Sequence, residues 1–168
     1  MAEGDDEFAA YAQARQHHLY RTAYLLCGNR DRAQDLVQTT LANLLRSWKR
    51  ACDADNPDAY AKKALVRAFL TEQRRHRREY AANRLAADPD VGGPPNRAEL
   101  RMVVLEALRE LPPKPRAMVI LRYWEDQSVE ETAALLGCSE GNVKSQCSRA
   151  LTKLRGLLGD QYPALAEP

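Results

Sequence analysis

Residues 128–155, with the sequence SVEETAALLGCSEGNVKSQCSRALTKLR, decide the fold predicted for the C-terminal half of the chain. Ser128 and Glu131 have the spacing of a capping box, in which the serine oxygen and the glutamate carboxylate each bind a backbone amide at a helix start. Gly137 is expected to end this short helix, and Ser139 can cap a second, longer one. Two helices joined by a short turn that contains glycine are typical of a helix-turn-helix, whose second helix enters the major groove of DNA.

The second helix of this pair has two chemically different faces. One face carries an apolar packing stripe with steps of three and four, formed by Val143, Cys147, Ala150, Leu151, Leu154 and Leu158. The opposite face is polar, and no acidic residue follows Glu140 in this helix. Because a carboxylate facing DNA would be repelled by phosphate, this composition favours DNA binding. The residues predicted to approach base edges or phosphates are Asn142, Lys144, Ser145, Ser148, Arg149, Thr152 and Lys153.

Outward from this motif, the N-terminal half shows the periodicity of further helices. The first pattern begins near Asp5 and ends at Gly28, and the second is expected to have Asp31 as its N-cap. A polar loop is predicted for residues 49–56. Trp48 lies on an apolar stripe and is expected to be a core anchor.

A third helix is expected from Asn56, which can cap it, and Pro57, which suits the first helical position. Its apolar stripe gives out near Glu72, and an exposed, arginine-rich arm is predicted beyond that residue. The net charge of the chain is only +2, but residues 62–84 hold a local surplus of six positive charges, and the rest of the chain is acidic. A basic stripe within an acidic protein is typical of phosphate contact, because each neutralised phosphate releases a counterion.

The composition changes abruptly at residues 87–95, ADPDVGGPP, which cannot sustain a helix and are predicted to form a flexible linker. Two small helical domains are therefore expected, at residues 5–86 and 96–158, and the predicted fold class is all-α. In the second domain Asn96 can cap a helix that ends before Pro112. A further helix, opened by Pro115, is expected to bury Trp124 as a core anchor.

Several classes of protein are disfavoured by what the sequence lacks. No apolar stretch approaches the roughly 20 residues that span a bilayer, and the acidic N-terminus is unlike a secretory signal. A cytoplasmic location without membrane insertion is therefore expected. The scattered cysteines are expected to stay reduced, mostly as small packed side chains. No Walker-type glycine loop, zinc-binding spacing or nucleophile motif is present, so neither a cofactor nor catalysis is expected.

The sequence also resembles a known family. The segments Leu136-Gly137-Cys138-Ser139, Gly141-Asn142-Val143-Lys144-Ser145 and Ser148-Arg149-Ala150 are similar to the fourth domain of bacterial sigma factors. The pattern Ala33-x-Asp35-x-x-Gln38-x-x-Leu41, followed by Trp48, is similar to the second-domain segment that docks on the polymerase. On these motifs the chain is identified as a small sigma factor of the extracytoplasmic-function type, similar to the sigma-E-like group of actinobacteria.

The resemblance implies a function and a set of contacts. The protein would bind core RNA polymerase through the β′ clamp and the β subunit, and Asp35, Gln38 and Thr39 would contact the clamp helices. The helix-turn-helix would bind the −35 promoter element, and the linker would thread through the polymerase. The loop at residues 49–56 would receive an unstacked base, and an anti-sigma factor is an expected partner. The −10 element and the displaced strand would be held by Asn56, Tyr60, Lys63, Arg67, Arg74 and Arg75.

The sequence departs from the family pattern at four positions. Ala68 and Glu72 stand where the family often has Asn and Asp, so base contacts from these two positions are not expected. Asn142 stands where Thr is common and Gln146 where Arg is common. These changes are expected to alter which promoters are chosen rather than whether DNA is bound.

Two other interpretations were left open by the sequence. A conventional helix-turn-helix regulator would share the C-terminal half but would bind its operator without polymerase. A metal-dependent nucleic-acid enzyme would have to use His17, His18 and acidic neighbours. A mobility shift with DNA alone and a metal analysis separate these interpretations from the first.

Overall fold

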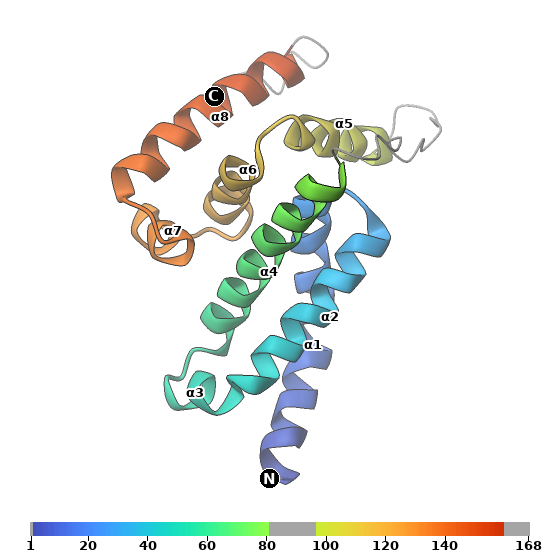
Figure 1. Cartoon of the computed structure of the whole chain (residues 1–168), viewed down its shortest axis with the longest axis vertical. Helices are drawn as coiled ribbons and strands as arrows, with labels where there is room; N and C mark the ends of the chain where they lie inside the picture. Colours follow the sequence, from blue (N-terminus) through green and yellow to red (C-terminus); the bar gives the residue numbers. More distant parts are fainter. Residues whose placement is uncertain (1, 81–96, 160–168) are drawn as a thin grey trace. The chain divides into compact units, whose positions relative to one another are not determined.

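The computed structural model describes residues 2–80 and 97–159, and all regular elements in these ranges are helices (Figure 1). The predicted all-α fold class is therefore confirmed. The chain divides into two compact units, Met1–Arg74 and Arg75–Pro168, which are considered separately below. The predicted linker at residues 87–95 and the predicted cap Asn96 lie outside the described residues. None of the helices in the described ranges is long and apolar enough to cross a membrane.

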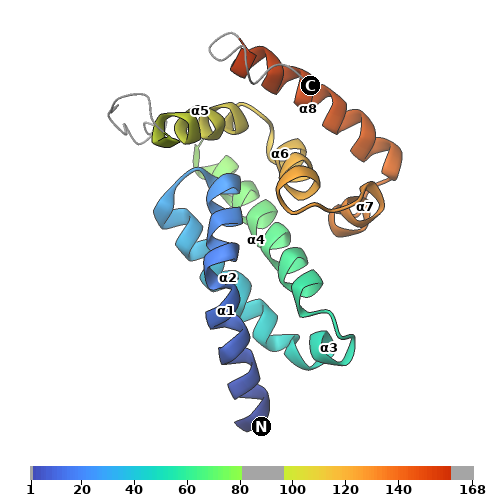
Figure 2. The same cartoon turned by 180° about the vertical axis from the view of Figure 1, so that it is seen from behind.

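The N-terminal unit is built on three long helices and one short helix, α1 (Ala2–Cys27), α2 (Arg30–Arg46), α3 (Trp48–Asp53) and α4 (Pro57–Tyr80), the last of which extends past the boundary of the unit at Arg74. Figures 1 and 2 show α1, α2 and the first part of α4 lying side by side, with α3 between the end of α2 and the start of α4. Their inward stripes form a core that includes Leu26, Leu36, Leu44, Leu65 and Phe69. Burial of such stripes stabilises these helices, because isolated helices are marginal in water.

Two local predictions in this unit are wrong. Helix α2 is capped by Asn29, not Asp31: Asn29 has an extended backbone, with φ of −143°, and its side chain accepts a hydrogen bond from the Arg32 amide at 3.0 Å. Asp31 instead lies in the first turn, where its charge complements the helix dipole. The predicted loop at residues 49–56 is mostly the short helix α3, since burial of Ala51 in the core holds this segment helical. Only the turn before Asn56 remains.

Trp48 is a core anchor, as predicted, with 8% of its surface exposed. Two aromatic rings of α1 pack against it: Phe8 edge-on, with ring centroids 5.4 Å apart, and Tyr11 at 5.2 Å. The Tyr11 hydroxyl also donates a 2.6 Å hydrogen bond to Asp58 Oδ1, and Arg15 Nε lies 3.2 Å from the same oxygen. Helix α1 therefore fixes the start of α4 through both apolar and polar contacts.

The C-terminal unit contains α5 (Arg97–Arg109), α6 (Pro113–Val119), a π-helical turn η1 (Ile120–Trp124), α7 (Val129–Leu136) and α8 (Glu140–Gly159). Helix α6 begins at Pro113, two residues before the predicted Pro115, because Pro112 already occupies the N-cap position. The prediction that Trp124 is a core anchor is wrong, since 43% of this residue is exposed. The prediction assumed the α-helical period, but the wider π-helical turn rotates Trp124 away from the position which that period gives.

The predicted helix-turn-helix is present as α7 and α8. Both hydrogen bonds of the capping box form, from the Glu131 amide to Ser128 Oγ at 3.0 Å and from the Ser128 amide to Glu131 Oε2 at 3.3 Å. Gly137 ends α7 in the left-handed region, with φ of 65°. Ser139 then caps α8, accepting a hydrogen bond from the Asn142 amide at 3.1 Å. The two helices pack with α6 around a small core formed by Met118, Ala133, Val143 and Cys147.

All four cysteines lie in the described ranges, and none of them forms a disulfide bond. Cys27 and Cys147 are buried, as expected, whereas Cys52 and Cys138 are partly exposed. Burial raises the pKa of the Cys147 thiol, which keeps this group protonated and chemically quiet.

The left-handed turn at Gly137 predicts a contrast between two glycines. Gly137→Ala should lower the free energy of unfolding by about 1–2 kcal/mol, because a Cβ atom is strained at positive φ. Gly141→Ala should raise it by up to about 1 kcal/mol, because alanine is the better helix former, and no neighbouring atom lies within 4 Å of the added Cβ. Urea unfolding followed by far-UV circular dichroism measures both changes. Equal effects of the two substitutions would contradict the turn geometry.

The Tyr11 contact predicts a dependence of stability on alkaline pH. Burial, together with the hydrogen bond to Asp58, raises the pKa of the Tyr11 phenol above its ordinary value of 10.0. The phenol therefore keeps its proton to higher pH in the folded chain than in the unfolded one, and its contribution to stability falls as the pH rises above about 10. Tyr11→Phe should flatten the decline in melting temperature between pH 9.5 and 11. Tyr123→Phe, which removes an exposed phenol, serves as the control, and parallel curves for Tyr11→Phe and the parent chain would argue against the shift.

Candidate functional site

Helix α8 presents the polar face that the sequence predicted. Its packing stripe is buried at Val143, Cys147, Ala150 and Leu154 and partly buried at Leu151 and Leu158. Of the residues predicted to contact DNA, Asn142 is partly buried and the others are exposed: Lys144, Ser145, Ser148, Arg149, Thr152 and Lys153. The packing of the apolar stripe thus fixes which side chains of this helix can meet a ligand.

Lys153 has a structural contact that the sequence did not indicate. Its Nζ donates a 2.8 Å hydrogen bond to the backbone carbonyl of Glu110, just after the end of α5. A second cation, the buried Arg116, acts nearby, because its Nη2 donates hydrogen bonds to the carbonyls of Leu111 at 3.0 Å and Arg109 at 3.4 Å. Positive groups at the end of α5 satisfy carbonyls that the helix leaves unpaired.

A groove of 350 Å³ runs between η1 and α8. Its cationic lining residues are Arg122, Lys144 and Arg155, and no acidic side chain lines it. Arg122 is held in place by a 2.7 Å hydrogen bond from Nη1 to the Gln127 carbonyl, and its guanidinium lies 5.6 Å from the centre of the Tyr123 ring. The remaining lining residues are Val129, Val143, Cys147, Ser148, Leu151 and Thr152.

Sequence reasoning missed Arg122, Tyr123 and Arg155 as members of this surface. The spacing of Lys144, Ser148 and Arg155 along α8 places them on one side of the helix and could have indicated Arg155. Arg122 and Tyr123 could not have been found in this way, because they reach the groove from the π-helical turn. Tyr123 is 57% exposed, which makes it accessible to a partner.

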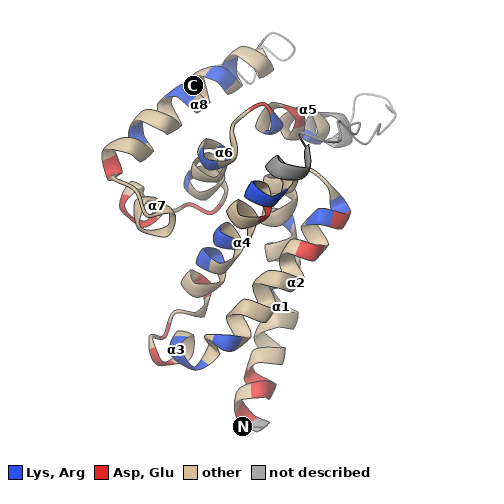
Figure 3. Cartoon of the chain, viewed as in Figure 1, with Lys and Arg blue, Asp and Glu red and all other residues tan. Residues whose placement is uncertain are grey.

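Helix α4 carries the second cationic surface, seen as the blue bands along this helix in Figure 3. The side chains of Lys63, Arg67, Arg74 and Arg75 are exposed, and Tyr60 is partly buried. Asn56 caps the helix as predicted, since its Oδ1 accepts a hydrogen bond from the Ala59 amide at 3.3 Å. The side chains of residues 77–80 lie outside the described part of the chain.

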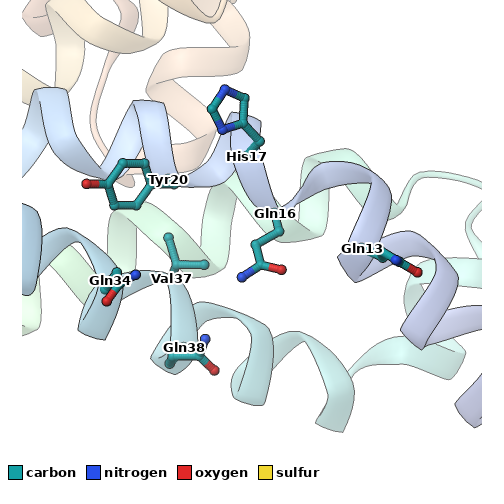
Figure 4. Close-up of a pocket in the computed structure, with 7 residues that line it drawn as sticks. All are labelled: Gln13, Gln16, His17, Tyr20, Gln34, Val37 and Gln38. Atoms are coloured by element: carbon teal, nitrogen blue, oxygen red, sulfur yellow. The ribbon is translucent and has the colours of Figure 1, made fainter.

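Helix α2 exposes Asp35, Gln38 and Thr39, the three residues predicted to contact polymerase. Beside them, a polar groove of 320 Å³ lies between α1 and α2 (Figure 4). Only Gln38 of the predicted residues lines it, together with Gln13, Gln16, His17, Tyr20, Gln34 and Val37. The four glutamine amides and the absence of Lys, Arg, Asp and Glu from this lining resemble the charge-depleted centre of protein interfaces. The contribution of α1 was not predicted, because it depends on how the two helices pack.

Comparison with protein families gives two matches in chain order. Residues 11–79 match the family described as sigma-70 region 2, and residues 101–154 match sigma-70, region 4. The first range holds α2, most of α1 and nearly all of α4, and the second holds the helix-turn-helix.

Alignments with curated relatives cover most of this chain and most of each relative. The RNA polymerase sigma-E factor of Streptomyces coelicolor is 39% identical over 151 residues, covering 89% of this chain and 84% of that protein. The extracytoplasmic-function sigma factor SigM of Mycobacterium tuberculosis is 30% identical over 156 residues, covering 92% and 79%. Among solved structures, the sigma factor RpoE of Bartonella quintana, in complex with the anti-sigma factor NepR, matches with a TM-score of 0.69. That match has 28% identity and covers 90% of this chain and 96% of the other.

Proposed function

The chain belongs to the sigma-70 family, in its extracytoplasmic-function group, and on this basis we propose that it binds core RNA polymerase and directs transcription from specific promoters. This family is not a family of enzymes. The proposal rests on one observation: the two segments that match the family are also the segments whose exposed surfaces are suited to binding DNA. The segment that matches region 4 is a capped helix-turn-helix whose second helix has no acidic residue after Glu140 in its first turn, and the segment that matches region 2 carries a second cationic face.

In this proposal α8 reads the −35 element. Arg149 and Asn142 approach base edges in the major groove, where Arg prefers guanine and Asn prefers adenine. The remaining contacts position the helix through phosphates or further base edges, from Lys144, Ser145, Ser148, Thr152 and Lys153. The cationic groove beside α8 supports an extension of this surface, with Arg122 and Arg155 as additional phosphate contacts.

Helix α4 and the turn before it act on the −10 element. The exposed cations Lys63, Arg67, Arg74 and Arg75 hold the displaced strand through its phosphates, and Asn56 and Tyr60 are the proposed contacts to an unpaired base. The sigma factor supplies only binding energy in this step. Capture of unpaired bases favours the open duplex because such bases are available only after melting.

Helix α2 docks on polymerase through Asp35, Gln38 and Thr39. The glutamine-lined groove between α1 and α2 supports this assignment, since a charge-depleted polar surface suits burial against another protein better than permanent exposure. An anti-sigma factor is proposed as a further partner, because the similar RpoE structure was solved as a complex with one. A regulator that works without polymerase is disfavoured by the match of the N-terminal unit to sigma-70 region 2.

The primary test is transcription with purified components. Core RNA polymerase supplemented with this chain should give run-off transcripts from a discrete set of start sites on fragmented genomic DNA, and core polymerase alone should not. Size-exclusion chromatography in mild salt, with no inhibitor present, should show the chain co-eluting with core polymerase. Absence of co-elution would overturn the proposal.

Substitutions on α8 and on α2 should have independent effects on DNA binding and on polymerase binding. Arg149→Ala should weaken promoter binding by about 1–3 kcal/mol, the usual cost of losing a base contact, and leave affinity for core polymerase intact. Asp35→Ala should weaken the affinity for core polymerase and leave promoter binding intact. Fluorescence anisotropy with labelled promoter DNA and competition for core polymerase measure the two affinities. Loss of both affinities in either variant would refute this division of labour.

A further inference from the structure

The turn between α3 and α4 and the first turn of α4 carry the two residues proposed to contact an unpaired base, Asn56 and Tyr60. The Asn56 amide binds this turn to α3 by donating to the Ala51 carbonyl at 3.1 Å. The bonds on the α4 side are longer, from the Ala59 amide to Asn56 Oδ1 at 3.3 Å and from the Tyr60 amide to the Asn56 carbonyl at 3.4 Å. Asp55 has a left-handed backbone, with φ of 52°, which a residue other than glycine keeps only when the surrounding structure holds it. Local bonds therefore hold the start of α4 weakly.

A shorter contact reaches the first turn of α4 from α1, at Asp58. The Tyr11 hydroxyl donates to Asp58 Oδ1 at 2.6 Å, and Arg15 Nε lies 3.2 Å from the same oxygen. Tyr11 is itself fixed, because its ring packs against the buried Trp48 with ring centroids 5.2 Å apart. Asp58 lies between the two proposed base contacts in the sequence, so α1 holds the segment that carries them.

From these contacts we infer that Tyr11 is a positioning residue for the capture of an unpaired base. It holds Asp58 and, through Asp58, the turn that presents Asn56 and Tyr60. The inference rests on the proposed role of this turn at the −10 element. Because successive residues of a helix are about 100° apart, Asp58 lies on nearly the opposite side of α4 from Tyr60. Helix α1 therefore supports α4 from behind and leaves the side of Tyr60 uncovered by this contact.

The expected effect is limited by what one hydrogen bond can contribute. The bond from Tyr11 can bias the turn toward its binding-competent arrangement by about two- to tenfold. Removal of the hydroxyl should weaken the affinity for an unpaired −10 strand by this factor. The affinity for core polymerase should not change, because the residues proposed to dock on polymerase, Asp35, Gln38 and Thr39, lie on α2.

The test measures, by fluorescence anisotropy, how tightly core RNA polymerase carrying this chain binds a fluorescein-labelled promoter fragment. The fragment comes from the strongest start site found by run-off transcription, with a double-stranded −35 element and a −10 element present only as the displaced strand. Tyr11→Phe should weaken binding about two- to tenfold. Tyr24→Phe is the matched control, because it removes a phenol of the same helix that stacks on Tyr20 instead, and it should bind like the parent chain.

Asp58→Ala tests the same contact from its other partner. This variant should also weaken binding, although removal of a carboxylate near DNA would strengthen binding if charge alone mattered. Tighter binding by Asp58→Ala, or binding of Tyr11→Phe like that of the parent chain, would overturn the inference. Equal losses of affinity for the fragment and for core polymerase in Tyr11→Phe would reduce the contact to a role in general stability, and would also overturn it.

A double variant, Asn56→Ser with Tyr60→Leu, separates this inference from the proposed function, because it keeps a good N-cap and removes both proposed base contacts. Adding Tyr11→Phe to it should cause no further loss, and a loss that persists would show that the contact acts elsewhere and overturn the inference. If the double variant binds like the parent chain, the proposed −10 contacts and this inference both fall. If it binds more weakly while Tyr11→Phe does not, only the positioning role falls.

Discussion

The rotation of α8 about its own axis is the constraint on which the proposed DNA surface depends. Burial of Val143, Cys147, Ala150 and Leu154 sets this rotation, because turning the helix would expose apolar area worth roughly 25 cal/mol per Å². The turn at Gly137 and the cap at Ser139 fix where the helix starts. The orientation of the polar face therefore does not depend on its own side chains, so these residues can vary without loss of the fold.

The parts of the fold that could be predicted from sequence are those encoded within a few residues. The capping box, the glycine turn and the faces of α8 belong to this class, because local hydrogen bonds and a long 3.6-residue period determine them. Helix α3 was missed because two turns give too little periodicity, and Trp124 because a π-helical turn breaks the period. Contacts between distant residues, such as Lys153 with Glu110 or Arg32 with Glu72, leave no local signal.

Two acidic side chains of the cationic helix α4 are each bound by residues of a neighbouring helix, which the small net charge of the chain does not reveal. Asp58, in its first turn, is bound by Tyr11 and Arg15 of α1, and Glu72 is bound by Arg32 of α2. Both neighbouring helices thus supply partners for carboxylates of α4, and Lys63, Arg67, Arg74 and Arg75 remain exposed. Charge bookkeeping over a whole chain misses such pairing, which becomes visible only when the helices are assembled.

The π-helical turn η1 makes the chain sensitive to length at one place. A π-turn holds one more residue than the α-helical turn it replaces. Loss of a single residue from Ile120–Trp124 would let the segment relax into continuous α-helix and rotate the following side chains by about 100°. Insertions and deletions should therefore be far less acceptable in these five residues than substitutions, because the register of this segment, rather than residue type, places Arg122 in the groove beside α8.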